Sequence, residues 1–122
     1  MKDFIVFLNS TINDMLNNLP GGEAGYANGY VAVPKDHPYY GRDYDSIDVD
    51  VHGGLTYSCP GEALTINTTG IELIEGNISN LKDYYVFGFD TCHYGDNLMN
   101  WSKEAVIAET LKLKRQLEEA YE

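Results

Sequence analysis

Apolar and polar side chains alternate strictly in one stretch near the middle of the chain. Between Ile47 and His52, the odd positions carry Ile, Val and Val, and the even positions carry Asp, Asp and His. Since successive side chains of a β-strand point to opposite faces of a sheet, this pattern predicts a strand with one apolar and one acidic face. Antiparallel sheets commonly bury one face and expose the other, so we expect an antiparallel sheet.

Further strands are predicted where β-branched and aromatic residues cluster between turn-forming residues. The clearest is Tyr84–Phe89, in which alternate aromatic side chains share one face. The other candidates are Tyr30–Val33, Leu55–Tyr57, and two weaker segments at Leu64–Asn67 and Ile71–Ile74.

Two helices are expected beside this sheet. Apolar residues between positions 5 and 19 recur every three or four positions, which predicts an amphipathic helix that ends at Pro20. The run Phe4–Leu8 taken alone could also form a strand. Ser102–Tyr121 is predicted to be the longest helix, with an apolar side and charge pairs four residues apart. We therefore expect one α+β domain over residues 1–122, with an antiparallel sheet flanked by an N-terminal helix and a long C-terminal helix.

The charge balance excludes several classes of protein. Nineteen acidic residues against eight Lys and Arg give a formal net charge of −11. This argues against binding DNA or anionic lipid, because both require clusters of basic residues. No apolar run approaches the ~18 residues of a membrane span, and Phe4–Leu8 is too short for a signal-peptide core. We expect a soluble cytoplasmic protein in which Cys59 and Cys92 are free thiols.

Aromatic residues gather in three segments, 35–45, 48–57 and 87–97, together with Gly and His. Aromatic rings stack on heterocyclic bases, and Tyr and Asn side chains hydrogen-bond ribose and base edges. Loop aromatics such as Tyr39 are therefore candidates for binding a nucleotide-like small molecule. For the aromatic residues of the strand at 84–89, burial in the core is an equally good interpretation.

A metal-dependent hydrolase is an alternative that the sequence leaves open. It would use His52, Asp90, His93 and Asp96, because imidazole and carboxylate groups suit zinc or manganese. The spacing lacks the tight helical His pair of a metalloprotease, and the same groups could simply satisfy turns. A nucleophilic Cys92 activated by its neighbour His93 is disfavoured, because adjacent side chains of an extended segment point apart. The leading expectation is therefore a protein with no catalytic residue, no cofactor and no bound metal.

Segments 48–57 and 87–97 carry motifs that resemble a known family. The run Gly29–Pro34 is followed by HGGLTY at 52–57 and by GFDTCHYGD at 88–96. Together these runs resemble the first-described family of Thoeris anti-defence proteins of phages and prophages, over most of the chain from Gly29 to the last helix.

The resemblance implies a function and a set of binding residues. Members of that family bind cyclic ADP-ribose isomers made by bacterial TIR-domain enzymes and hold them without cleavage, which blocks the immune signal. Some also bind cyclic oligonucleotides at a second site in a larger oligomer. The family pattern implies an aromatic residue that stacks on adenine and an Asn about ten positions later, here Phe87 and Asn97, with Phe89 as the competing aromatic.

A phosphorylated ligand would need the few bases of this acidic chain. The resemblance implies a basic residue of the last helix at the phosphates, here Lys114 or Arg115, and Arg42 is a further candidate. His93 and Asp96 complete the expected ligand-binding set. A domain this small would build its pocket with a partner subunit, so a homodimer or larger homo-oligomer is expected. An inhibitor that blocks a host protein directly is the remaining alternative, and it would suit an acidic surface.

Overall fold

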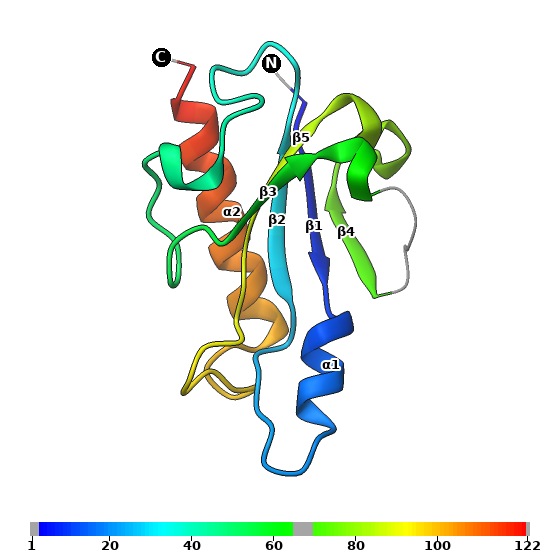
Figure 1. Ribbon diagram of the computed structural model, residues 1–122, viewed down its shortest axis with the longest axis vertical. Coiled ribbons are helices and arrows are strands. Elements are labelled where there is room, and N and C mark those ends of the chain that lie inside the picture. The colour runs from blue at the N-terminus through cyan, green and yellow to red at the C-terminus, as the bar shows by residue number, and fades with distance from the viewer. Residues whose placement is uncertain (1–2, 65–69, 122) are drawn as a thin grey trace.

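A five-stranded antiparallel sheet organises the chain, as Figure 1 shows for the computed structural model, which describes residues 3–64 and 70–121. The strand order is β3-β5-β2-β1-β4, so that β5, β2 and β1 lie between other strands. The strands are β1 (Ile5–Asn9), β2 (Asn28–Val33), β3 (Tyr57–Pro60), β4 (Ile71–Glu75) and β5 (Tyr85–Phe89). The helices are α1 (Thr11–Asn17) and α2 (Lys103–Glu119), and short 3₁₀ helices occur at Tyr44–Ser46, Gly61–Leu64 and Ile78–Asp83. The predicted α+β class is confirmed.

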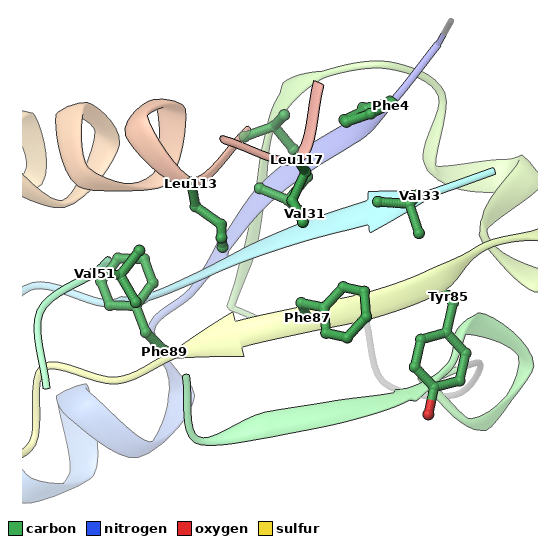
Figure 2. Close-up of a cluster of buried hydrophobic side chains, with 10 residues drawn as sticks. Phe4, Val31, Val33, Val51, Tyr85, Phe87, Phe89, Leu113 and Leu117 are labelled. Atoms are coloured by element: carbon green, nitrogen blue, oxygen red, sulfur yellow. The ribbon is translucent and has the colours of Figure 1, made fainter. Parts of the chain in front are cut away.

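Helix α2 covers one face of the sheet. It begins at the N-cap Ser102, whose hydroxyl accepts a hydrogen bond from the Ala105 backbone N–H. Its buried face carries Val106, Thr110, Leu113 and Leu117, and this face packs on the aromatic side of β5 and on β2. Figure 2 shows Leu113 and Leu117 of this face between the helix and the strands. The long C-terminal helix was therefore predicted correctly from its periodicity.

The N-terminal segment differs from its prediction as one helix. Phe4–Leu8 is buried throughout, and Ile5–Asn9 forms the strand that pairs with both β2 and β4. Both faces of this strand are covered, since Phe4 and Val6 belong to one apolar cluster and Ile5 and Phe7 to another. A run of five apolar residues cannot be told from a buried helix by its pattern. Only the second half is helical. There, α1 extends beyond the end of the sheet (Figure 1) and leaves Ile12 and Met15 largely exposed.

The segment with strict alternation is extended but is not a strand of the sheet. Val51 is buried, and Ile47 and Val49 are partly buried against the core beneath α2, while Asp48 and Asp50 are exposed. The predicted apolar and acidic faces are therefore present. The prediction of a strand was wrong because the backbone of this segment is held by α2 side chains: Gln116 bonds to Asp50, and Glu109 accepts from the His52 N–H.

The opposite face of the sheet carries a second apolar cluster. Ile5, Phe7 and Val86 are buried there beneath Leu81, which belongs to the 3₁₀ helix at 78–83. The remaining strand predictions are confirmed for β2, β4 and β5. The segment predicted at Leu55–Tyr57 enters the sheet two residues later, as β3, and Leu64–Asn67 lies largely outside the described residues. No helix in the described part of the chain is long and apolar enough to cross a membrane.

Candidate functional site

A hollow lies on the face of the sheet away from α2, where the 3₁₀ helices do not cover it. It has a volume of about 560 Å³, within the range of small-molecule pockets. The absence of a side chain at Gly88 lets the Tyr30 ring take its place in the wall of the hollow, since a Cβ at Gly88 would lie 2.5 Å from that ring. The lining residues are Ile12, Asn28, Tyr30, Thr56, Tyr57, Phe89, Asp90, Cys92 and His93.

Two tyrosine rings form the apolar wall of this hollow. Tyr30 stacks on the buried ring of Phe7, with centroids 5.1 Å apart and planes 11° apart, and Tyr57 meets Tyr30 edge-on at 5.8 Å. The Tyr57 hydroxyl lies 3.0 Å from the Cys59 sulfur. Burial raises the pKa of both tyrosines, so the phenols stay neutral and present hydroxyl groups as hydrogen-bonding partners.

A polar rim follows β5 at the other side of the hollow. The Asn28 side chain accepts a hydrogen bond from the Thr91 backbone N–H at 3.0 Å, and Asp90 accepts one from the Cys92 N–H at 3.0 Å. These local bonds turn the chain at the end of β5 and bring His93 to the edge of the hollow. The arrangement places an amide, a carboxylate and an imidazole beside the two tyrosine rings.

His93 also belongs to a second group of polar side chains. His52 Nε2 lies 3.0 Å from both carboxylate oxygens of Asp96, and His93 Nδ1 lies 2.9 Å from Asp96 Oδ2. The same oxygen accepts the His93 backbone N–H at 2.9 Å. The carboxylate of Asp96 is only 6% exposed. Asp90 stands at the margin, with Oδ1 3.5 Å from His93 Nδ1.

Residues of three segments fix this group. The His52 ring packs on Trp101 at a centroid distance of 4.3 Å, and its backbone N–H is bonded to Glu109 of α2. Gly53 adopts φ of +70°, and a Cβ there would lie 2.5 Å from the ring of His93. Glycine is therefore required at position 53 for two reasons, the backbone conformation and the space for the imidazole.

The electrostatics of the site keep Asp96 charged and Cys92 neutral. Burial would raise the pKa of Asp96, but hydrogen bonds from His52 and His93 outweigh it and hold the pKa below its usual value. Burial, with Asp90 and Asp96 nearby, raises the pKa of the Cys92 thiol. A protonated thiol is a poor nucleophile, which agrees with the expectation that Cys92 and His93 do not form a catalytic pair.

Phe87 is not available as a stacking surface in this chain. Its side chain has no solvent-exposed area and lies among Val31, Val33 and Leu113 in the core (Figure 2). The stacking role expected for it is corrected for a physical reason: alternation along β5 turns Phe87 toward α2, away from the hollow. Phe89 borders the hollow, yet it is only 1% exposed and packs on the same core.

Asn97 lies apart from both phenylalanines. Its side-chain oxygen accepts the backbone N–H groups of Met99 and Asn100, so it shapes the loop before α2. It lines a different hollow with Asn17, Glu23, Leu98 and Met99. The expected pairing of Phe87 with Asn97 in one pocket is therefore not found.

The expected basic residues are also dispersed. Lys114 forms an ion pair with Glu75 and lines a third hollow on the far side of α2 from segment 47–51. Arg115 is exposed on the outer side of α2. Arg42 bonds to the Ser46 carbonyl and lies over the ring of Tyr39, 5.3 Å from its centroid. Tyr39 in turn contacts His37 near the C-terminal end of α2, whereas the hollow lies toward the other end of the sheet.

The structure thus brings together His52, His93 and Asp96, with Asp90 beside them, which is the set of the metal-hydrolase alternative. The sequence reasoning missed Asn28, Tyr30 and Tyr57 as site residues. The available signal was the alternation of β2 and β5, which puts Tyr30 and Gly88 opposite each other on the face away from Phe87. Both cysteines are free, as expected.

In comparisons with known proteins, no family model, no curated protein and no solved structure matches this chain.

Proposed function

We propose that this protein binds a cyclic nucleotide signal, of the cyclic ADP-ribose class made by bacterial TIR-domain enzymes, and holds it without cleavage. Such capture would block the Thoeris immune response of a bacterium on behalf of a phage or prophage. The observation that carries the proposal is the hollow in which two tyrosine rings face a rim of Asn28, Asp90 and His93. The motifs at 52–57 and 88–96, which carry the resemblance, contribute directly to this hollow.

The chemistry of the wall suits the parts of a nucleotide. A purine base would stack on Tyr57 or Tyr30, a contact of about 1–3 kcal/mol per base. The ribose hydroxyls would donate hydrogen bonds to the Asp90 carboxylate and would bond to the Asn28 amide. Both are suitable partners, because a hydroxyl group can donate and accept hydrogen bonds. In this proposal Tyr57 and Tyr30 take the role that the resemblance implied for Phe87.

The phosphates of the ligand require positive charge that the lining of the hollow does not supply: its residues include no Lys or Arg. Arg42, Lys114 and Arg115 lie elsewhere on the chain. In the proposal, a second copy of the protein brings one of these basic residues to the ligand. The proposal therefore includes a homodimer or larger homo-oligomer, in which a neighbouring copy closes the hollow.

Binding calorimetry with purified protein and a cyclic ADP-ribose isomer tests the proposal. The bound ligand is then released by heat and identified by mass spectrometry, and intact ligand is expected. Tyr57→Leu should weaken binding by about 10-fold or more, in line with the loss of one stacking contact. Tyr44→Leu is the matched control, because Tyr44 is a partly exposed tyrosine of the 3₁₀ helix at 44–46 and not of the hollow.

Three results would contradict the proposal. Absence of binding to any cyclic ADP-ribose isomer would remove its premise, and equal affinity of wild type and Tyr57→Leu would place the ligand elsewhere. Recovery of a linearised or hydrolysed product would support the hydrolase alternative instead.

A further inference from the structure

We propose that His52, His93 and Asp96 bind one divalent metal ion of the zinc type. This proposal does not rest on the proposed function, although His93 lies in both sites, and it departs from the expectation that the protein holds no metal. It is inferred from the geometry of three side chains that come from two distant segments of the sequence.

The donor atoms converge as the ligands of a single ion do. His52 Nε2, His93 Nδ1 and a carboxylate oxygen of Asp96 all lie within 4.8 Å of one another. Ligands at the usual zinc distances of about 2.0–2.2 Å in a tetrahedron are about 3.3 Å apart. The separations of 2.9 and 3.0 Å from the imidazole nitrogens to Asp96 need only a few tenths of an ångström of expansion.

The orientation of the two rings agrees with shared coordination. The imidazole planes of His52 and His93 are 87° apart with centroids 5.0 Å apart, so that each ring presents a nitrogen to Asp96 without blocking the other. Two imidazoles and one carboxylate form a donor set that zinc accepts, and they leave a fourth position for water or a ligand. Asp90 Oδ1 lies 3.5 Å from His93 Nδ1, so that a further carboxylate stands beside this group.

Independent features hold the three ligands in place. The Asp96 carboxylate accepts the His93 backbone N–H, Trp101 packs on His52, and Glu109 fixes the His52 backbone. The absence of a side chain at Gly53 makes the space for the His93 ring. These contacts fix the positions of the two imidazole rings and of the carboxylate.

The charge of the surroundings favours a cation. Asp90, Asp96 and Glu109 lie in or beside the group, and the whole chain carries a formal net charge of −11. An ion would also join segment 47–52 to the loop between β5 and α2, since His52 belongs to the first and His93 with Asp96 to the second. The alternative is a hydrogen-bonded His–Asp–His group that needs no ion, and the experiment separates the two.

The experiment titrates metal-free protein with Zn²⁺ alone in a calorimeter and with Co²⁺ alone in an absorption spectrometer. We expect one ion per chain and the visible d–d bands of a four- or five-coordinate Co²⁺ site. Zn²⁺ should also raise the unfolding temperature. His52→Gln should weaken Zn²⁺ binding by at least about 100-fold, because loss of a ligand exceeds the loss of an outer contact.

Two further variants keep the result interpretable. Asp96→Asn removes the shared carboxylate, but Asp96 is buried and its loss affects folding as well as binding. His52→Gln is therefore the primary variant, because the His52 side chain is 26% exposed. Circular dichroism checks the fold of both variants. Asp48→Asn is the control, since it removes an exposed carboxylate of the same segment outside the group. The proposal is overturned if wild type binds no Zn²⁺, or if His52→Gln binds Zn²⁺ as tightly as Asp48→Asn does. No nucleotide is present, so the outcome does not depend on the proposed function.

Discussion

The side-chain amide of Gln116 in α2 forms hydrogen bonds with both the N–H and the carbonyl of the Asp50 backbone. Its Oε1 accepts the Asp50 N–H at 2.7 Å, and its Nε2 donates to the Asp50 carbonyl at 2.9 Å. A side chain thereby replaces the neighbouring strand that an extended segment normally requires. This pairing keeps segment 47–51 against α2 and leads the chain to His52.

Replacing Gln116 should loosen that segment more than it destabilises the protein. Gln116→Leu keeps the size of the side chain and removes both hydrogen bonds, so we expect a loss of about 1–2 kcal/mol in the free energy of unfolding. Amide hydrogen exchange at Asp50 and His52 should become faster while exchange in β5 does not change. Arg115→Leu, an exposed neighbour on the same helix, is the control, and equal exchange in both variants would contradict this role of Gln116.

Phe87 should behave as a core residue. Phe87→Ala leaves a cavity between β5 and α2, and such truncations cost about 3–5 kcal/mol. Urea denaturation measures the loss. If Phe87 instead stacked on a ligand, the variant would keep the stability of the wild type and lose only affinity.

Gly88 should be required for the shape of the hollow. In Gly88→Ala the new Cβ would lie 2.5 Å from the Tyr30 ring, which has little room to move because it stacks on Phe7. We expect about 1–3 kcal/mol of destabilisation from overpacking. Binding of a cyclic nucleotide should weaken as well, and calorimetry on the folded variant checks this. An unchanged affinity would show that the ligand does not contact Tyr30.

His37 should make stability depend on pH. Its Nδ1 accepts the Tyr39 N–H at 2.9 Å and its Nε2 lies 2.7 Å from the Leu117 carbonyl, an arrangement that only a neutral ring with its proton on Nε2 satisfies. Burial lowers its pKa below the ordinary value of 6.5 in spite of the bond to Leu117. The unfolded chain then binds more protons, so this residue's contribution is complete above about pH 6.5 and falls as the pH drops toward the folded pKa.

Urea denaturation between pH 5 and 8 tests this prediction. Wild type should lose stability below about pH 6.5. In His37→Asn, which cannot titrate, the loss over the same range should be smaller. Parallel pH profiles of the two proteins would contradict the assignment to His37.

The site was only partly predictable from the sequence. His52, His93 and Asp96 were identified as candidates because imidazole and carboxylate groups suit a metal ion and because they lie in the motifs that carry the resemblance. The residues that form the wall of the hollow were missed, since Tyr30 and Tyr57 occur in ordinary strand patterns. Their proximity depends on the register in which β2 and β3 pair with β5, where both lie opposite Gly88.

The sequence by itself determined the period with which side chains are buried in segment 47–51 and in α2. The alternation in segment 47–51 and the helical period of α2 match the observed burial, because such periods follow from the geometry of consecutive residues. In β5 and α1 the surroundings decided burial: β5 is buried throughout, and Ile12 and Met15 of α1 are exposed. The tertiary structure alone decided what each face meets. It placed Phe4–Leu8 in the middle of the sheet, attached segment 47–51 to α2 and brought His52 to Asp96, 44 residues away. Such contacts join distant parts of the chain, and the free energy that selects them is shared among many packing partners, so no local pattern specifies them.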